Sequence, residues 1–459
     1  MTLRVGVIGG GLAGITAALR CADAGCAVTL VESRPRLGGL AASFRRGELD
    51  IDTGQHVFLR CCTSYRALLD RLGVTDQVVL QARLDIAVHA PGRRPSRLRR
   101  TRLPAPLHLA GALLRYRPLA VRDRLRLIGA ALAMRALDPT DPRTDARSFA
   151  EWLTEHGQSD RAVAALWDLV GVATLNATAD RASLALAATV FQQGLLTDPA
   201  AGDIGWSRVP LGRLHDDAAG RALRAAEVDV RLSTKARRLA ARPDGGWRLT
   251  LTRAVDHEEE LVFDRIVCAV PPTAADRLLP PATLRYPPGW AARLGSSPIV
   301  NAHVVYDRRV LEPEFVAALD SPLQWVFDRT AAAGLHRRWP PDAQYLAVSL
   351  SAADSLITRP TAQLRAALLP ALAALLPAAR KAAVLDFFVT REPHATFRAA
   401  PGSAALRPPA RTQAPGLFLA GAWTDTGWPA TMEGAVRSGA TAAHALLAGV
   451  GPVRTEAAA

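Results

Sequence analysis

The sequence predicts an α/β protein in which a Rossmann-like dinucleotide-binding domain is interleaved with an α+β domain that carries a helical insertion. A glycine cluster follows an apolar run almost at the start of the chain, and a second apolar run meets a glycine near its end. Between them, apolar residues recur at helical spacing over about 104–200, where helices are expected over 107–115, 121–137, 148–156 and 161–169, and later in strand-like runs. The stretch DGG over 244–246 predicts a hairpin turn. The chain has 459 residues, too many for one simple core.

The glycine cluster lies in VGVIGGGLAGITAALR, which starts at Val5. The run over 3–8 predicts a buried strand, and Gly9, Gly11 and Gly14 then fit G-x-G-x-x-G. The first glycine permits a tight turn, the second lets the backbone approach a pyrophosphate, and the third allows close packing of helix on strand. The stretch therefore predicts a phosphate-binding turn.

The helix expected over 12–24 starts with Leu12 and Ala13, so its N-terminus points at the phosphates. A second strand, expected over 27–31, leads to Glu32, at the distance where an acid binds a ribose hydroxyl. The order strand, turn, helix, strand and acid predicts an adenine dinucleotide. By itself this order leaves NAD and FAD open.

The stretch after Glu32 reads SRPRLGGL and contains a second glycine pair flanked by arginines. Such a stretch suits a pyrophosphate that is held from both sides. We therefore expect further cofactor contacts from Ser33, Arg36, Gly38, Gly39 and Leu40.

Glu32 with this glycine pair resembles the E-x-x-x-x-x-G-G extension of the FAD-containing amine oxidase and phytoene desaturase superfamily. The resemblance implies that the cofactor is FAD, held by an FAD domain of the two-dinucleotide-binding type. It also implies a contact from Ala236 and a C-terminal segment that returns to complete the site. The middle of the chain would then supply the substrate domain.

The far end of the chain agrees with this expectation. GLFLAG over 416–421 predicts a short strand that meets a glycine, and a helix is expected to begin near Thr431. In the family this helix N-terminus faces the N1/O2 edge of the flavin, where reduction places negative charge. Glu433 is expected to stabilise that N-terminus. The resemblance implies cofactor contacts from Gly421, Ala422, Ala430, Thr431 and Met432.

Three stretches narrow the resemblance to the hydroxysqualene dehydroxylase family: DTGQHVFL from Asp52, SPIVNAHVVY from Ser297, and TGWPATMEGAVRSG from Thr426. The resemblance implies reduction of hydroxysqualene to squalene, in squalene and hopanoid biosynthesis, with cofactor contacts from Gly54, Gln55 and His56. The family usually has Ala-Gly-Asp where this chain has Ala-Gly-Ala ending at Ala422. Loss of that carboxylate predicts weaker FAD binding by roughly 1–3 kcal/mol.

The reaction needs a proton for the leaving oxygen. His56 is the first candidate donor, because it follows the Gly54 turn near the flavin ring, and Asp425 is the second. A hydrogen-bonded structural role is the alternative for His56, and helix capping or a cofactor contact for Asp425. Trp423 and Trp428 either wall the flavin or pack in the core. The chain has no second G-x-G-x-x-G, so we expect an external electron donor.

Three other functions compete with this one. Amine oxidation is disfavoured because Asn301 stands where amine oxidases commonly carry a lysine. A carotenoid or phytoene-type desaturase or isomerase shares the fold, the cofactor and an isoprenoid lipid substrate, and is the main alternative. A non-catalytic prenyl-lipid-binding relative is opposed by the intact glycine turns.

The charge of the chain bears on its partners. The formal net charge is +14, and the basic residues are densest from Arg93 to Leu119, with leucines, prolines and a tyrosine among them. Such a stretch fits an anionic membrane surface, with a solvated surface as the alternative. No nucleic-acid-binding motif accompanies it. There is no apolar run of about twenty residues and no signal-peptide pattern, so we expect a cytoplasmic protein, peripherally attached to membrane.

The five cysteines lack metal-ligand spacing, and we expect them to be reduced. Covalent flavin attachment at Cys61 or Cys62 is disfavoured. The predicted organisation is an FAD domain in three parts, 1–82, 208–272 and 410–450, a substrate domain in two parts, 83–207 and 273–409, and a tail, 451–459.

Overall fold

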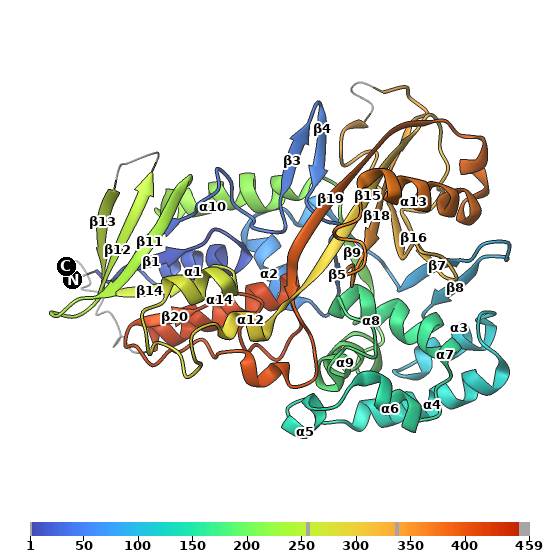
Figure 1. Cartoon of the computed structure of the whole chain (residues 1–459), viewed down its shortest axis with the longest axis horizontal. Coiled ribbons are helices and arrows are strands. Elements are labelled where there is room, and N and C mark those ends of the chain that lie inside the picture. The colour runs from blue at the N-terminus through green and yellow to red at the C-terminus, as the bar shows by residue number, and fades with distance from the viewer. Residues whose placement is uncertain (1, 254–257, 336–338, 449–459) are drawn as a thin grey trace, which may run out of the picture.

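The computed structural model describes residues 2–253, 258–335 and 339–448. Its elements form two lobes (Figure 1). One lobe, on the left in this view, contains a parallel sheet with the first and last helices of the chain. The other contains a long mixed sheet at the top and a group of helices below it.

The first lobe is built on a five-stranded parallel sheet. Its strands are short runs of Val, Ile and Leu, most of them buried, as expected for a parallel sheet that is covered on both faces. In spatial order they are β10 (Asp229–Arg231), β2 (Ala27–Val31), β1 (Arg4–Ile8), β14 (Arg265–Cys268) and β20 (Leu417–Leu419). The sheet therefore joins strands from both ends of the chain and from its middle, which agrees with a domain assembled from separate segments.

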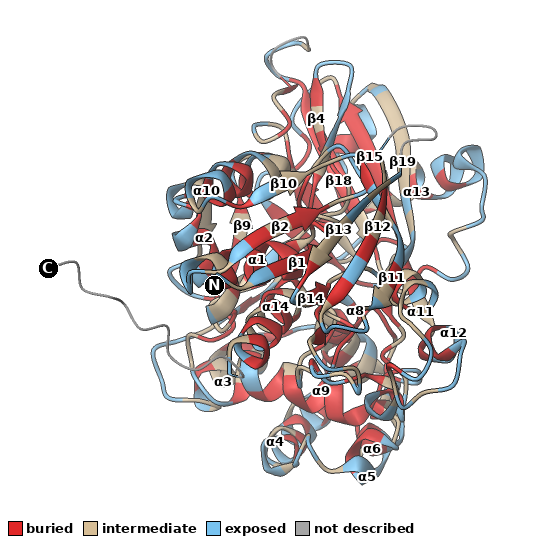
Figure 2. Cartoon of the chain, turned by 90° about the vertical axis from the view of Figure 1, so that its left-hand side faces the viewer, coloured by how far each residue is buried: buried red, intermediate tan, exposed pale blue. Residues whose placement is uncertain are grey.

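Both faces of this sheet are covered. On one face α1 (Leu12–Asp23) lies against α14 (Met432–Leu447), so closely that a Cβ on Gly439 would stand 2.1 Å from the Ala13 carbonyl oxygen. On the other face lies an antiparallel sheet of β11 (Thr234–Ala241), β12 (Trp247–Arg253) and β13 (Glu258–Phe263). Figure 2 shows how much of the central sheet and of α1 and α14 is buried.

The turn expected at residues 244–246 joins β11 to β12. Gly245 and Gly246 both have positive φ, 93° and 78°, which favours glycine there. The hairpin prediction is confirmed.

The second lobe contains a seven-stranded mixed sheet. In spatial order its strands are β19 (Val384–Phe397), β15 (Ser296–Tyr306), β18 (Gln344–Leu350), β17 (Trp325–Asp328), β16 (Phe315–Ala318), β7 (Asp85–His89) and β8 (Ser96–Arg99). One face of β15 packs under α13 (Thr361–Leu375) through Val300, Ala302 and Val304. The other face carries Asn301 and His303, and it meets the β3–β4 hairpin of Ser43–Arg46 and Leu49–Asp52.

A small antiparallel sheet links the lobes. It pairs β5 (Val57–Leu59) and β6 (Val78–Leu80) with β9 (Ile204–Ser207), which lies far along the chain. The remaining helices near the first lobe are α2 (Thr63–Arg71), α10 (Ala219–Ala225), α11 (Pro272–Leu278) and α12 (Trp290–Leu294).

The helical region expected between residues 104 and 200 is present, at the lower right of Figure 1. The helices expected over 107–115, 121–137 and 148–156 are confirmed, whereas the one expected over 161–169 is longer. There a π-helical turn, Val163–Trp167, carries the helix on to Leu175. The α-helices are α3 (Ala110–Arg115), α4 (Val121–Ala136), α5 (Pro142–Asp145), α6 (Phe149–Glu155), α7 (Asp160–Ala162), α8 (Asp168–Leu175) and α9 (Leu184–Phe191).

Among the residues that the structure describes, no helix is long and apolar enough to cross a bilayer. All five cysteines are free thiols. Within the same residues, no group of three His, Cys, Asp or Glu side chains is placed to hold a metal ion.

Candidate active site

The turn between β1 and α1 is shaped by backbone contact at two glycines and left open at a third. A Cβ on Gly9 would lie 2.6 Å from the Ala269 carbonyl oxygen, and one on Gly14 only 1.8 Å from the Gly9 carbonyl oxygen. Around Gly11, in contrast, the nearest atom to such a Cβ is the Cα of Gly39, 3.9 Å away. The protein itself therefore leaves room above Gly11, as a pyrophosphate requires.

The second glycine pair closes the other side of this space. The Gly38 N–H donates to the Gly10 carbonyl at 2.9 Å, and a Cβ on Gly39 would stand 3.1 Å from the Gly11 Cα. The Arg36 guanidinium donates to the Gly39 carbonyl at 3.2 Å. Burial, and secondly Arg34, lowers the pKa of Arg36, which still leaves a cation beside the two turns.

The Glu32 carboxylate fixes the turns to one another. It accepts hydrogen bonds from the Gly10 N–H at 2.7 Å, the Arg34 N–H at 2.8 Å and the Ser33 hydroxyl at 3.1 Å. The Thr234 N–H donates to the Glu32 carbonyl, which brings the start of β11, and with it Ala236, beside the same loop. The expected phosphate and ribose residues thus lie together.

The start of α14 is the second helix N-terminus of the site. The Thr431 hydroxyl accepts the Gly434 N–H at 3.1 Å and caps the helix, and the Met432 side chain is buried. Gly439 crosses α1 at Ala13, and seven residues of helix span about 10 Å. The two helix N-termini are thus separated by a distance that one dinucleotide can bridge.

Glu433 lies in the first turn of α14, where it was expected, and it also caps a second helix. Its buried carboxylate accepts the N–H groups of Ser64 and Tyr65 at 3.2 and 2.7 Å, at the start of α2, and pairs with Arg437. Sequence spacing could not show this, because α2 is more than 360 residues away along the chain. Glu433 therefore ties the C-terminal segment to the N-terminal one.

The loop before α14 is organised by Arg407, a residue that sequence reasoning missed. Its guanidinium is almost fully buried and donates to the carbonyls of Ala422, Thr424 and Trp428. Burial lowers the pKa of Arg407 to about 10. It lies in a run of prolines and alanines without any recognisable pattern, so no sequence signal marked it.

Two predicted residues of this loop have clear positions. Gly421 has a φ of 138°, and its N–H donates to the Ser438 hydroxyl at 2.8 Å. Trp423 donates to the Val270 carbonyl and packs against Trp290, so it belongs to the core. Asp425 lies exposed on the loop, with its N–H bonded to the Pro408 carbonyl. Its role as a proton donor stays a prediction.

Gly54, His56 and Asn301 come together between the lobes. A Cβ on Gly54 would lie 3.4 Å from the His56 ring and 3.7 Å from the Asn301 amide nitrogen. The His56 Nδ1 lies 2.9 Å from the Gly54 carbonyl oxygen, so it carries the proton of that hydrogen bond and leaves Nε2 with a lone pair. Burial lowers the pKa of His56, opposed by this hydrogen bond and by Asp52.

Asn301 is the most unusual residue of this group. It is 1% exposed, and within the described residues neither its amide oxygen nor its amide nitrogen has a hydrogen-bond partner. A buried amide without partners costs about 1–3 kcal/mol, so such a group points to a missing ligand or water. The open space above Gly11 and the unpartnered Asn301 both fit a long cofactor held between the lobes. The Asn301 amide can both donate and accept a hydrogen bond, and the edge of a flavin ring offers a matching acceptor and donor.

The walls near this group are held by buried polar contacts. Asp52 and Arg329 form a buried ion pair at 2.9 Å, and Arg329 also donates to the Ser207 carbonyl at 2.7 Å. Asp52 accepts the Ser43 hydroxyl and the Leu211 N–H as well. The pair joins β4 to the second lobe. The sequence showed Asp52 within its motif but gave no sign of its partner, which lies 277 residues away.

Two buried histidines lie behind the site. His215 bonds to the Ala41 carbonyl and to the Tyr65 hydroxyl, at 2.7 and 2.9 Å, and burial lowers its pKa to about 4. His303 bonds to the hydroxyls of Tyr345 and Thr390, and burial lowers its pKa to about 3. Both are therefore neutral near pH 7. Neither was a predicted site residue.

Comparisons with known proteins agree with this arrangement. Residues 12–447 match the family model described as flavin containing amine oxidoreductase. A hydroxysqualene dehydroxylase of Rhodopseudomonas palustris is 30% identical, over 98% of this chain and 99% of the relative. A 15-cis-phytoene desaturase of Narcissus pseudonarcissus is 26% identical, over 97% of this chain and 79% of the relative.

Solved structures share the fold. An oxidoreductase from Methanosarcina mazei superimposes with a TM-score of 0.72 at 14% identity, over 95% of this chain and 99% of that one. A putrescine oxidase bound to putrescine gives 0.69 at 18% identity, over 98% and 100%. The matched length, the glycine turns and the shared fold lead to one conclusion: this chain belongs to the flavin-containing amine oxidoreductase family and is an oxidoreductase that uses a flavin.

Proposed function

We propose that this protein binds FAD and removes the hydroxyl group of hydroxysqualene to give squalene. The observation that carries the proposal is the similarity to a hydroxysqualene dehydroxylase over nearly the whole of both chains. The motif residues of that family, from Asp52 to His56 and from Thr426 to Gly439, support the proposal. An isoprenoid lipid is therefore the substrate class.

The glycine turns, Arg36 and the first turn of α1 would hold the FAD pyrophosphate, and Glu32 and Ala236 would contact the adenosine part. The amides at the start of α14 would lie toward the flavin ring. FAD, when bound and reduced, would supply the hydride that replaces the hydroxyl at the allylic carbon. The carbon–oxygen bond breaks as the hydroxyl takes up one proton and leaves as water.

We assign the proton donor to His56. With Nδ1 bonded to the Gly54 carbonyl, Nε2 is the free nitrogen, and it holds a proton only in the imidazolium form. Because burial lowers the pKa of His56, the donor form increases as the pH falls. The rate should therefore fall as the pH rises through that lowered pKa. A His56→Gln variant should lose this pH dependence, and Asp425→Asn should keep it.

Asn301 completes the site as a neutral group that can both donate and accept. It can hold the flavin edge or the departing water without bringing a charge into a pocket for an apolar chain. Among the described residues, the expected lysine of amine oxidases is absent from this position of β15. This favours a substrate without an amine.

A phytoene-type desaturase is the second candidate, favoured by the 26% identity with the Narcissus enzyme. In that reaction the substrate gives a hydride to oxidised flavin, so the two functions run in opposite redox directions. The proposed reaction requires a reductant for the flavin, and an external electron donor supplies it.

The test is to incubate the FAD-loaded protein anaerobically with dithionite as reductant and with hydroxysqualene, then analyse the extracted lipids. Squalene in an amount stoichiometric with consumed hydroxysqualene supports the proposal. The matched arm contains oxidised enzyme with phytoene. Desaturated phytoene there, with hydroxysqualene unchanged in the first arm, would assign the second function.

A further inference from the structure

We infer that the outer surface of α3 and α4 docks this protein on an anionic lipid bilayer. This surface, called the α3–α4 surface below, consists of an apolar ridge and an adjoining cluster of unpaired arginines. The ridge is formed by Leu103, Leu107, Leu114, Val121, Leu125, Ile128 and Leu132. The inference is independent of the reaction, because it rests on the surface alone.

The ridge stands out among the described residues by its exposure. Its large apolar side chains are 52–68% exposed, whereas every other exposed large apolar side chain in the described chain is at most 40% exposed. Seven such residues lie within thirty positions, on α3, α4 and the segment before them, rather than scattered over the described chain. A patch of this kind marks a binding surface.

The helix α4 is apolar on two opposite sides. Leu127, Ala130 and Met134 point inward and are buried, which is enough to hold the helix in the fold. Val121, Leu125, Ile128 and Leu132 follow an i, i+4, i+7, i+11 spacing on the outer side and are 53–68% exposed. The helix α4 lies near the lower edge of the molecule in Figure 2. A helix that needs only one stripe for packing carries the second for a partner.

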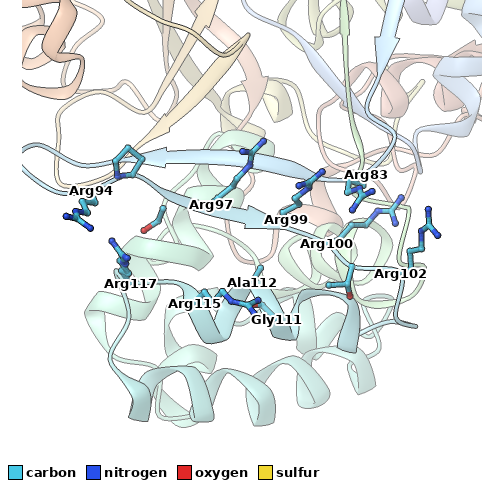
Figure 3. Close-up of a pocket in the computed structure, with 13 residues that line it drawn as sticks. Arg83, Arg94, Arg97, Arg99, Arg100, Arg102, Gly111, Ala112, Arg115 and Arg117 are labelled. Atoms are coloured by element: carbon cyan, nitrogen blue, oxygen red, sulfur yellow. The ribbon is translucent and has the colours of Figure 1, made fainter.

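Arginines gather in a hollow between β8 and α3, next to the ridge (Figure 3). Three of them are already paired with carboxylates within the fold. Arg97 and Arg99 share Asp85, and Arg100 shares the fully buried Asp203 with Arg60. These pairs hold the sheet edge together and offset part of the arginine charge.

The other arginines of the hollow are available. Arg83, Arg94, Arg102, Arg115 and Arg117 are exposed, and none forms an ion pair with a carboxylate of the described chain. Arg102 precedes Leu103 and Arg115 follows Leu114, so charge and apolar side chains alternate on one surface. Exposed guanidinium groups bind phosphate headgroups, and the neighbouring leucines insert among the acyl chains.

Charge complementarity favours a bilayer over other partners. A second copy of this chain would bring the same unpaired arginines face to face, and their repulsion opposes a symmetric dimer. A nucleic acid would leave the leucine ridge in water. An anionic bilayer satisfies both parts of the surface at once, with phosphates for the arginines and hydrocarbon for the ridge.

The test is cosedimentation of the full chain with two kinds of vesicle. One consists of phosphatidylcholine alone, and the other also contains about 30% of the anionic lipid phosphatidylglycerol. We expect binding to the anionic vesicles that weakens with salt and is far weaker on neutral ones. Replacing Arg102, Arg115 and Arg117 by Gln should lower the partition coefficient about a hundredfold, since each arginine near the surface contributes about fivefold.

The matched control replaces Arg20, Arg221 and Arg224 by Gln. These residues are exposed on α1 and α10, in the other lobe. This variant also loses three positive charges, so its net charge equals that of the first variant. It should bind like the unchanged protein. Equal loss in both variants would show that net charge alone drives binding and would overturn the assignment of the surface.

The apolar ridge is tested by a separate pair of variants. Leu125→Gln with Ile128→Gln should lower binding about tenfold, whereas Phe44→Gln with Leu385→Gln should not. Absence of wild-type binding at low salt, or unchanged binding in the ridge variant, would overturn the inference. A stable dimer in sedimentation velocity that the ridge variant dissociates would instead assign the ridge to a second copy. Circular dichroism melting checks that every variant is folded.

Discussion

The phosphate turn and the Asn301 end of the site are built in different ways. At Gly9, Gly11 and Gly14 the backbone forms the site, and the space around each glycine decides whether a Cβ would fit there. Around Asn301 a buried side chain stands without partners, and neighbouring side chains hold the walls. The protein alone forms the turn and leaves a space there. The Asn301 amide, in contrast, lacks hydrogen-bond partners that a ligand could supply.

This difference suggests what each end contributes. A backbone turn binds any pyrophosphate of the right shape, so it determines that a dinucleotide binds. In the proposed function, the Asn301 end, with Gly54 and His56 beside it, controls the reaction of the bound group. Substitutions at the two ends should therefore fail in distinguishable ways.

The largest effects of substitution are expected at the turn. There, one glycine is needed for folding and another for flavin binding. Gly14→Val should prevent folding, because its Cβ would overlap the Gly9 carbonyl at 1.8 Å. Gly11→Val should fold, since its φ of −74° is ordinary and its Cβ meets nothing closer than 3.9 Å, yet it should lose the flavin. Circular dichroism and flavin absorbance measure the two outcomes. Normal flavin content in folded Gly11→Val would mean that the space above Gly11 is not the phosphate site.

The buried ion pair between Asp52 and Arg329 comes next. Arg329→Met should lower the free energy of unfolding by about 3–5 kcal/mol, because it leaves the Asp52 charge buried without a partner. Arg248→Met is the control, since its pair with Glu260 is half-exposed at both ends and should contribute less than about 1 kcal/mol. Denaturant titration measures both. Similar losses would show that the wall between the lobes does not depend on the pair.

Acid should destabilise the protein through its buried histidines. The pKa of His215 is lowered to about 4 in the fold, so below about pH 6.5 the unfolded chain binds a proton that the folded chain rejects. Stability is then lost as the pH falls from about 6.5 to 4, by about 3 kcal/mol for this residue. His215→Phe should therefore reduce the slope of unfolding free energy against pH. An unchanged slope in His215→Phe would contradict the burial of a neutral ring.

The smallest effect on stability, but a clear one on activity, is expected at Asn301. Asn301→Leu removes two unpartnered polar atoms, so the flavin-free protein should gain about 1–2 kcal/mol. The same change should slow the reaction at least about tenfold, the loss expected for one hydrogen bond. Asn301→Leu that is less stable and fully active would mean that the amide serves only packing.

Sequence reasoning worked where a constraint is local. The glycine turns, Glu32, the hairpin at residues 244–246 and the cap at Thr431 each depend on neighbours in the chain, and each lies where it was expected. It was less successful where a contact crosses the fold. Arg407, the partner of Asp52, and the helix that Glu433 caps all depend on residues brought together only by the complete fold.

The helical region shows the same limit. Apolar spacing located its helices, but the second apolar stripe of α4 could not be told from a packing stripe until the burial of each side was known. Likewise the basic stretch includes Arg97, Arg99 and Arg100, which the fold pairs with Asp85 and Asp203. The number of basic residues in a stretch therefore overstates the charge available to a partner.

The most direct test of the account is a single-turnover measurement. The FAD-loaded protein is photoreduced without oxygen and mixed with hydroxysqualene, and the return of oxidised flavin absorbance is followed in the wild type and in Asn301→Leu. The account predicts rapid reoxidation that is slowed in the variant. The account would be contradicted if the wild type holds a flavin that dissolved oxygen can oxidise but that hydroxysqualene does not reoxidise.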